Sequence, residues 1–145
     1  MQVAEILKKK GTDVATVGPA ETIATACETL RTYGIGALVV SDDGTSIDGI
    51  ISERDVVRAL GDGPEVELLA RPCSDIMTAE VFTCSTDDRV EHLMSLMTEN
   101  RIRHLPVAVD GSLAGIISIG DVVKFRLSEL EAEARHLEDY IHHGR

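Results

Sequence analysis

The nonapeptide GIISERDVV, Gly49–Val57, recurs as GIISIGDVV, Gly115–Val123, with only its fifth and sixth letters changed. Each copy begins with apolar residues that favour a strand. Ser-x-x-Asp and further apolar residues follow, a pattern typical of the start of a helix. Because a segment that returns in this way indicates a duplicated structural unit, the sequence predicts two related halves.

The duplication extends upstream of this nonapeptide, because residues 16–40 align without a gap onto residues 83–107. Both segments carry the i, i+3, i+4, i+7 stripe of an amphipathic helix, formed by Ile23, Ala26, Cys27 and Leu30 and by Val90, Leu93, Met94 and Met97. We expect the first helix to begin at Gly18, with Pro19 in its first turn, and to end at Gly34. The second is expected to begin at Ser85.

Two short strands and a second helix follow each of these helices. The first strands are expected at 37–41 and 105–109, and the Asp-Gly pairs at 43–44 and 110–111 predict hairpin turns before the strands that end in GII. The second helices are expected at 53–60 and from 119 onward. The sequence therefore predicts an α+β fold of the α/β type, with two βαββα repeats and a C-terminal helix.

Neither repeat is large enough to bury a sufficient core alone, so we expect the two to pack about a pseudo-twofold axis and form a cleft. The expected divisions are repeat 1 at residues 1–62, a linker at 63–72, repeat 2 at 73–127 and a helical extension at 128–145.

The overall charge excludes several classes of partner. A formal net charge of −11 over 145 residues disfavours general binding to nucleic acids or anionic membranes, since those partners need clustered basic residues. No apolar run approaches the length of a membrane-spanning helix. Cys27, Cys73 and Cys84 lack C-x-x-C spacing, which favours structural thiols in a reducing compartment, and we expect a cytoplasmic location. We expect no metal site, because the C-terminal histidines have no matching ligands spaced with them.

The order of these motifs resembles a tandem CBS-domain pair, or Bateman module, of the stand-alone type. The resemblance rests on SDIMT at 74–78, IGALVV and IRHLPV after the first helices, and the two GII-Ser-x-x-Asp-Val-Val segments. It implies a cleft that binds adenosine ligands, with AMP ranked first and ATP or NAD(H) as alternatives. It also implies that the motif Asp binds ribose and the motif Ser contacts phosphate.

The chemistry of the repeated motif suits such a ligand. A carboxylate at Asp55 or Asp121 can accept hydrogen bonds from both ribose hydroxyls, and Ser52 or Ser118 at a helix N-terminus can help to hold a phosphate. The alternative is a capping box, in which Ser and Asp only satisfy the helix end. Taken alone the segment favours the cap, whereas its duplication and the resemblance favour ligand contact. The two roles are compatible, because both use the same helix end.

Further residues are expected beside the ligand. The resemblance implies contacts from Thr16, Thr83, Ala37 and Pro106, although packing within a strand explains Ala37 and Pro106 equally well. Arg103 and His104 form a local basic cluster with Arg101 that suits a phosphate. Lys10 belongs to a Lys-Lys-Lys-Gly insertion specific to the first repeat, which could pair with phosphates or simply be solvated.

The two letters that differ between the nonapeptides predict two non-equivalent sites. Arg54 offers a cation that can reach a phosphate, whereas Gly120 is uncharged and allows close backbone approach.

The C-terminal segment carries a different pattern. Apolar residues at alternating steps of four and three form an a/d seam, at Val123, Leu127, Leu130, Ala134, Leu137 and Ile141. The seam could pack on its own module or on a partner, and we expect a homodimer in which this helix contacts the neighbour.

Three classes of function remain open. The first is a regulatory adenosine-nucleotide sensor that signals to an unidentified partner protein. The alternatives are a structural dimerisation module and, with less support, a nucleotide-acting enzyme. The sequence shows no catalytic set of residues, so we expect a non-enzyme.

Overall fold

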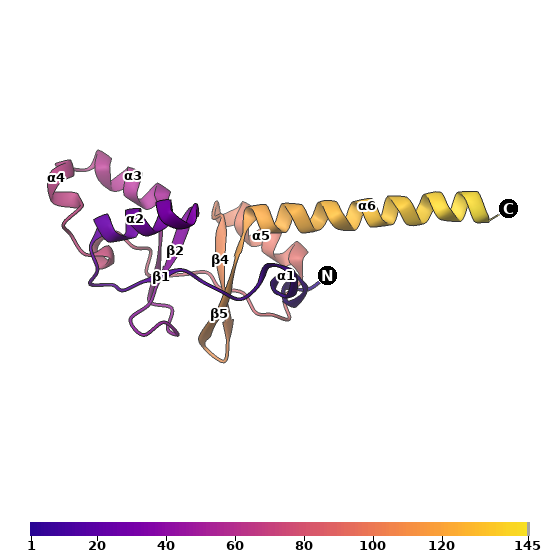
Figure 1. Ribbon diagram of the computed structural model, residues 1–145, viewed down its shortest axis with the longest axis horizontal. Helices are drawn as coiled ribbons and strands as arrows, with labels where there is room; N and C mark the ends of the chain where they lie inside the picture. The colour runs from indigo at the N-terminus through magenta and orange to yellow at the C-terminus, as the bar shows by residue number, and fades with distance from the viewer. Residues whose placement is uncertain (145) are drawn as a thin grey trace.

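Each repeat pairs short strands and covers them with helices (Figure 1). The computed structural model describes residues 1–144. In the first repeat, β1 (Thr16–Val17), β2 (Ala37–Val40) and β3 (Gly49–Ser52) form a sheet in that order, with β1 parallel and β3 antiparallel to β2. In the second, β4 (His104–Val109) and β5 (Ser112–Ser118) form an antiparallel pair. A parallel bridge from Cys84 to Val107 takes the place that β1 has in the first repeat.

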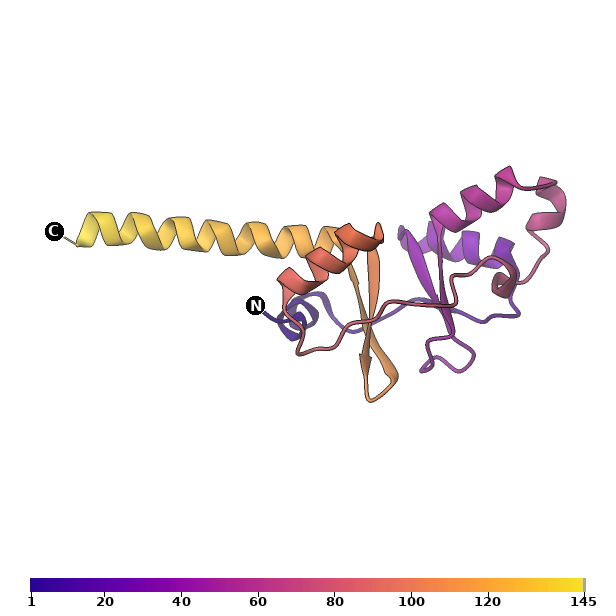
Figure 2. The same cartoon turned by 180° about the vertical axis from the view of Figure 1, so that it is seen from behind.

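The helices follow the predicted order. The first repeat carries α2 (Ile23–Tyr33) and α3 (Glu53–Gly61), and the second carries α5 (Val90–Asn100) and α6 (Ile119–His143). The short helix α4 (Glu65–Leu68) and the 3-10 turn η1 (Cys73–Asp75) lie in the connection between repeats, which Figure 2 shows from behind. The predicted α+β fold with two βαββα-like repeats and a C-terminal helix is confirmed.

The leading segments of the two repeats exchange places. Helix α1 (Val3–Lys10) precedes the first repeat, yet Val3, Ile6 and Leu7 are buried in the core of the second repeat. Conversely, Cys73 is buried in the core of the first repeat, with Met77 packed against it. Figures 1 and 2 show α1 lying beside α5 and α6 rather than beside α2. Each core is therefore completed by chain from the other half, which holds the two repeats together.

The glycines of the two GII segments make this exchange possible. A Cβ on Gly115 would lie 2.8 Å from Cδ2 of Leu7, and a Cβ on Gly49 would lie 2.6 Å from Sδ of Met77. Because non-bonded carbon and sulfur atoms do not approach so closely, each glycine is required where the crossing segment packs on the strand. The recurring Gly thus marks the place on each strand where a segment from the other repeat packs.

Both helices that were expected to start early begin several residues later. The N–H of Gly18 donates to Glu21 Oε2 and the N–H of Ser85 donates to Asp88 Oδ2, both at 2.8 Å, so residues 18–21 and 85–88 form turns. Helix α2 begins only after the cap Thr22, and α5 begins at Val90. The predicted starts at Gly18 and Ser85 were wrong, because the side chains three residues later close a turn instead of a helix.

The helix ends and hairpins agree better with prediction. Gly34 ends α2 in the left-handed conformation, as expected of a C-terminal glycine. Asp110 and Gly111 both have positive φ, the geometry of a tight type I′ hairpin turn between β4 and β5. The loop at residues 41–48 is longer, and Asp43 Oδ1 accepts the N–H groups of Thr45 and Ser46 within it.

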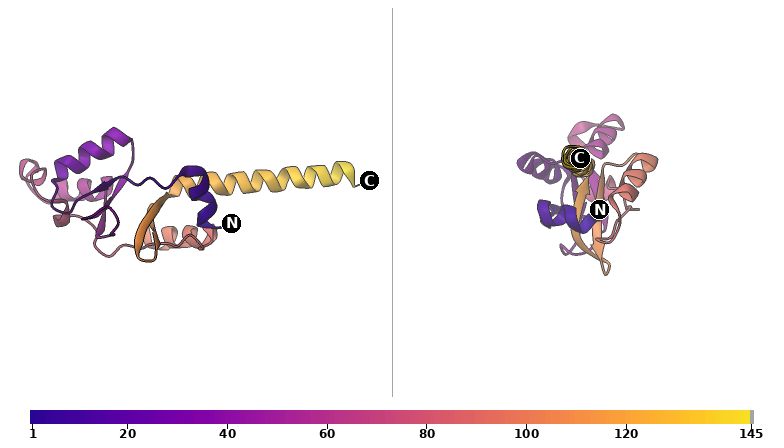
Figure 3. Two further views of the ribbon diagram at one scale, coloured as in Figure 1. Left: turned by 60° about the horizontal axis from the view of Figure 1, so that its bottom comes forward. Right: turned by 90° about the vertical axis from the view of Figure 1, so that its right-hand side faces the viewer.

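Helix α6 leaves the module soon after it begins. Only Val122 and Phe125 of α6 are buried, and the helix then projects away from both sheets (Figures 1 and 3). The predicted seam is exposed, including Leu127 at 55% and Leu137 at 63%. Of the two alternatives for the seam, packing on its own module is therefore excluded over its described length.

Candidate functional site

The two Ser-x-x-Asp motifs form reciprocal caps at the N-termini of α3 and α6. The N–H of Ser52 donates to Asp55 Oδ2 at 2.8 Å, and the N–H of Asp55 donates to Ser52 Oγ at 3.3 Å. The corresponding distances for Ser118 and Asp121 are 2.9 and 3.2 Å. Both capping boxes expected from the sequence are present. Each cap uses Oδ2, and among the described contacts Oδ1 of both Asp side chains has no protein donor.

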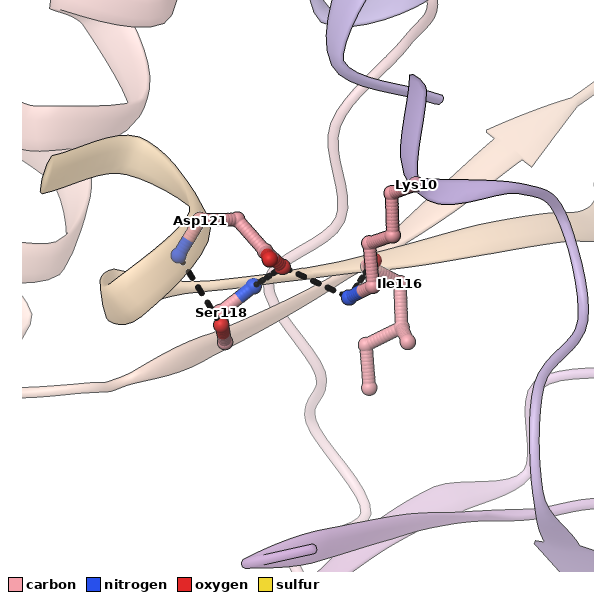
Figure 4. A network of polar contacts seen from close by, with 4 residues as sticks. All are labelled: Lys10, Ile116, Ser118 and Asp121. Carbon is pink, nitrogen blue, oxygen red and sulfur yellow. Dashed lines mark hydrogen bonds and ion pairs between the residues drawn. The ribbon is translucent and has the colours of Figure 1, made fainter. Parts of the chain in front are cut away.

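A lysine from the other half of the molecule reaches Asp121. Lys10, the last residue of α1, donates from Nζ to Asp121 Oδ2 at 2.6 Å and to the carbonyl oxygen of Ile116 at 2.8 Å (Figure 4). The two side chains of the ion pair are 32% and 23% exposed. Partial burial alone would raise the pKa of Asp121, but the Lys10 ammonium and the Ser118 N–H outweigh it and lower that pKa.

The corresponding place in the first repeat is filled differently. The carbonyl oxygen of Ile50 accepts the backbone N–H of Thr78 at 2.9 Å, where Ile116 accepts the ammonium of Lys10. Ser52 Oγ donates to Asp55 Oδ2 at 3.0 Å, and among the described residues no lysine reaches Asp55. The two motifs therefore share a backbone geometry and differ in charge. The sequence also predicted a difference in charge, but it based that difference on Arg54 and Gly120, whereas the one seen here comes from Lys10.

Other polar groups meet where the repeats face each other. Arg54, at the start of α3, donates from Nη1 to the carbonyl oxygen of Arg101 at 3.2 Å, so it reaches the end of α5 in the other repeat. The ring of His104 lies against Gly36, since a Cβ on Gly36 would be 3.5 Å from its Cε1, and the Glu53 carboxyl lies at the same place. Thus β4 of one repeat faces the entrance to β2 of the other.

His104 lies among four charged groups at this junction. Burial lowers the pKa of His104, and the charges of Lys10 and Arg103 lower it further, whereas Asp121 and Glu53 act in the opposite direction. Its imidazole is therefore favoured in the neutral form at pH 7. A neutral imidazole can donate or accept one hydrogen bond to a polar ligand.

The remaining predicted residues occupy varied places. Ala37 and Pro106 are buried within β2 and β4, which agrees with the packing alternative. Thr16 lies in β1 and is half-buried, whereas Thr83 and Gly120 are exposed. Contact of these residues with a ligand stays a prediction.

The three consecutive lysines have separate surroundings. Lys10 pairs with Asp121, Lys9 lies 5.2 Å from the ring centre of Phe125, and Lys8 is exposed. The cation–π contact between Lys9 and Phe125 holds α1 against the N-terminal turns of α6. Of the two interpretations of the lysine run, simple exposure to solvent therefore applies to Lys8. Lys9 and Lys10 instead join α1 to the start of α6.

Two surface grooves flank the motifs without being lined by Asp55 or Asp121 themselves, since Gly120 lines one groove and Glu53 lines the other. One runs along α6 between Ile119 and Glu131, and the other lies between α2 and α3, lined by Cys27 and Val57 among others. Among the described side chains, those of residues 1–64 and 67–144, no three of His, Cys, Asp or Glu gather as a metal site would need. None of the helices described has the length and apolarity to cross a membrane.

Sequence reasoning missed two contributions to the junction. Glu53 was noted only as a letter that differs between repeats, yet it lies near His104 and Gly36. The carbonyl groups of Arg101 and Ile116 bind basic side chains, and no sequence pattern marks a carbonyl for such a role. The available signal was the difference between the two nonapeptides at their fifth letter, where the first has the charged Glu53 and the second has the apolar Ile119.

Comparison with known proteins identifies the class to which this fold and these motifs belong. The CBS domain family model matches residues 3–62 and 73–128, one match for each repeat. The chain belongs to the CBS-domain family. It is 37% identical over 129 residues to the CBS domain-containing protein CBSX3, mitochondrial, of Arabidopsis thaliana, a match over 86% of this chain and 62% of that protein. The chain thus spans less than two thirds of that relative's length.

Solved structures of the same family share the fold. The CBS-domain containing protein ATU1752 from Agrobacterium tumefaciens has 45% sequence identity and a TM-score of 0.83, covering 87% of this chain and 99% of that one. Two further structures contain adenosine compounds. Protein MJ0100, in complex with 5′-methylthioadenosine and S-adenosyl-L-methionine, is 25% identical with a TM-score of 0.77 over 89% of this chain and 98% of that one. PAE2072 from Pyrobaculum aerophilum, complexed with AMP, is 26% identical with a TM-score of 0.73 over 83% of this chain and 89% of that one.

Proposed function

We propose that this protein is a regulatory module that binds an adenosine nucleotide, with AMP ranked first, where its two repeats face each other. The observation that carries the proposal is the repeated Ser-x-x-Asp cap at the N-termini of α3 and α6, whose Asp keeps one oxygen to which no described residue donates. The adenosine compounds bound by MJ0100 and PAE2072 support this ligand class. ATP and NAD(H) are the alternatives.

The Asp and the Ser of each motif fit different parts of such a ligand. Asp55 and Asp121 each offer a carboxylate to the two adjacent hydroxyls of a ribose. The N-terminus of α6 or α3 presents backbone N–H groups and a Ser hydroxyl to a phosphate, and the helix dipole favours negative charge there. The basic groups of Arg54, Arg103 and Lys10 add local positive charge to an acidic protein.

Isothermal titration calorimetry with AMP, ATP and NADH tests the proposal directly. We expect Asp55→Ala and Asp121→Ala each to weaken binding at one site by about 1.5–3 kcal/mol, the value of a charge-assisted hydrogen bond. Asp88→Ala is the matched control, since Asp88 closes a comparable turn through the Ser85 N–H and is not part of either motif. If both motif variants melted early but bound like the wild type, the residues would serve only as caps and the proposal would fail.

Two other functions have distinct signatures. A purely structural dimerisation module would show no thermal stabilisation by any adenosine ligand, because a ligand specific for the folded state must raise stability. A nucleotide-acting enzyme would turn over AMP, ATP or NADH during incubation, and we expect no turnover. The cytoplasmic location expected from the sequence stays a prediction, and the Arabidopsis relative is named as mitochondrial.

We further propose that the protein acts as a homodimer joined by the exposed seam of α6. Asp121 lies in the first turn of the same helix whose later turns carry the seam, so the ligand site and the seam share one rigid element. Ligand binding can then be coupled to the assembly, provided that two arrangements of the helix differ in ligand affinity. The regulated partner protein would respond to this difference.

A further inference from the structure

We propose that Lys10 makes the Asp121 site selective for phosphorylated adenosine ligands over uncharged ones. The inference rests on the proposed function and concerns which members of the ligand class this site accepts. In the free protein, Lys10 neutralises the carboxylate that the ribose is to occupy. On binding, its ammonium moves from Asp121 to the phosphate of the same ligand.

The first step of the argument is the occupancy of the Asp121 carboxylate. Oδ2 already accepts the Ser118 N–H at 2.9 Å and the Lys10 ammonium at 2.6 Å. A ribose that uses both carboxylate oxygens must therefore compete with Lys10 for Oδ2. An adenosine ligand without a charge would have to break this ion pair and leave the ammonium without a counter-ion.

The second step concerns the ammonium after displacement. Apart from Asp121, its described partner is the carbonyl oxygen of Ile116, which is a neutral acceptor. The Lys10 side chain is only 32% exposed, so water replaces the lost partner incompletely. A phosphate on the displacing ligand supplies a new anion within reach of the flexible four-carbon stem. The exchange then replaces one charge-assisted contact with another.

The third step is the contrast with Asp55. There the position of the Lys10 ammonium is taken by the backbone N–H of Thr78, which binds the carbonyl oxygen of Ile50 and carries no charge. Asp55 is capped by Ser52 alone among the described residues, so a ribose meets no ion pair. The Asp55 site therefore lacks this penalty against uncharged adenosine ligands.

The test compares AMP with adenosine by calorimetry in the full chain carrying Asp55→Asn, so that binding at the other site is weakened and the Asp121 site dominates the titration. In this background, we expect Lys10→Met to change the affinity for AMP little, because the lost contact with the phosphate is offset by the ion pair that no longer has to be broken. Adenosine should bind the same variant roughly 10-fold more tightly than it binds the protein with Lys10, because no ion pair has to be broken. Lys8→Met is the matched control, since it removes the same charge from an exposed neighbour and should leave the AMP-to-adenosine affinity ratio unchanged.

A conservative variant guards against a structural effect of losing the Ile116 contact. Lys10→Arg retains a cation and donors, and it should restore most of the preference for AMP. If Lys10→Met left the affinity ratio equal to that of Lys8→Met, the inference would be overturned while the proposed function stood. If neither AMP nor adenosine bound the unsubstituted protein, the proposed function would fail first and the inference with it.

Discussion

At the scale of single residues, Gly34 and Arg101 occupy the same place in the two repeats with different consequences. Gly34 ends α2 at φ 62° and Arg101 ends α5 at φ 55°, both in the left-handed region. An L-residue pays a steric cost of about 1–2 kcal/mol there, whereas glycine does not. The second repeat already carries this cost, and the first avoids it.

We therefore expect Gly34→Ala to lower the free energy of unfolding by about 1 kcal/mol and Arg101→Ala to leave it nearly unchanged. Nothing lies within 4 Å of a Cβ added at Gly34, so the loss would come from backbone conformation and not from a clash. Urea denaturation of both variants measures the difference. Equal losses would show that the Arg101 side chain stabilises the molecule beyond its backbone.

His104 predicts a pH dependence of stability. Its pKa is lower in the folded protein than its ordinary value of 6.5, mainly through burial. The unfolded chain therefore takes up a proton first as the pH falls, and stability is lost from about 6.5 downward until the folded-state pKa is passed. Above that window the contribution is fully present.

The measurement is thermal melting of the wild type and His104→Gln between pH 5 and pH 8. The wild type should lose more stability than the variant on going to pH 5, because only the wild type must desolvate a protonated imidazole. Parallel curves for the two proteins would contradict a lowered pKa for His104.

The sequence predicted the local caps of the two motifs but not the long-range contacts of their residues. The caps at Ser52 and Ser118 follow from local spacing, because their partners lie only three residues away. The ion pair of Lys10 with Asp121 joins residues 111 positions apart, and only the tertiary fold decides that contact. Local patterns fix local hydrogen bonds, whereas long-range contacts depend on how the halves cross.

At the scale of elements, the exchange of leading segments is the main feature that the sequence did not show. The order of helices and strands follows from periodicity, so the repeats were predicted correctly. Helix α1 was not predicted, and even the helical spacing of Val3, Ile6 and Leu7 does not say which core receives them. The recurring Gly49 and Gly115 were the visible sign of close approach, since each receives a side chain from the crossing segment.

This exchange predicts unequal costs for two equivalent substitutions. A Cβ at Gly49 would meet Met77 Sδ at 2.6 Å and the carbonyl oxygen of Thr78 at 2.9 Å, and that carbonyl is held by the Ile50 N–H. At Gly115 the nearest atom is the flexible end of Leu7. We expect Gly49→Ala to lower the free energy of unfolding by about 2–3 kcal/mol and Gly115→Ala by about 1 kcal/mol.

A double-mutant cycle checks the crossing itself. Leu7→Ala opens space above Gly115, so combining it with Gly115→Ala should cost less than the sum of the two single losses in chemical denaturation. Additive losses would mean that α1 does not pack on β5 in solution.

At the scale of the whole molecule, α6 is the element whose role its own module does not explain. Its heptad seam was predicted, but a seam defines a contact face without naming what covers it. In the structure this face is exposed along the projecting part of the helix. A solvent-exposed apolar stripe of this length is typical of an interaction surface, and a second copy of the same helix offers a stripe with the same spacing.

The oligomeric state tests this assignment. Leu130 and Leu137 both lie at d positions of the seam and are 45% and 63% exposed. Replacing both with Lys should convert a dimer into a monomer in light scattering coupled to size exclusion, because two charges per helix would be buried without partners. Ala132→Lys is the matched control, since position 132 lies on the opposite side of the heptad and Lys retains helix propensity. A double variant that stays dimeric would place the contact between copies elsewhere on the module, and a wild type that is monomeric at all concentrations would rule out the homodimer.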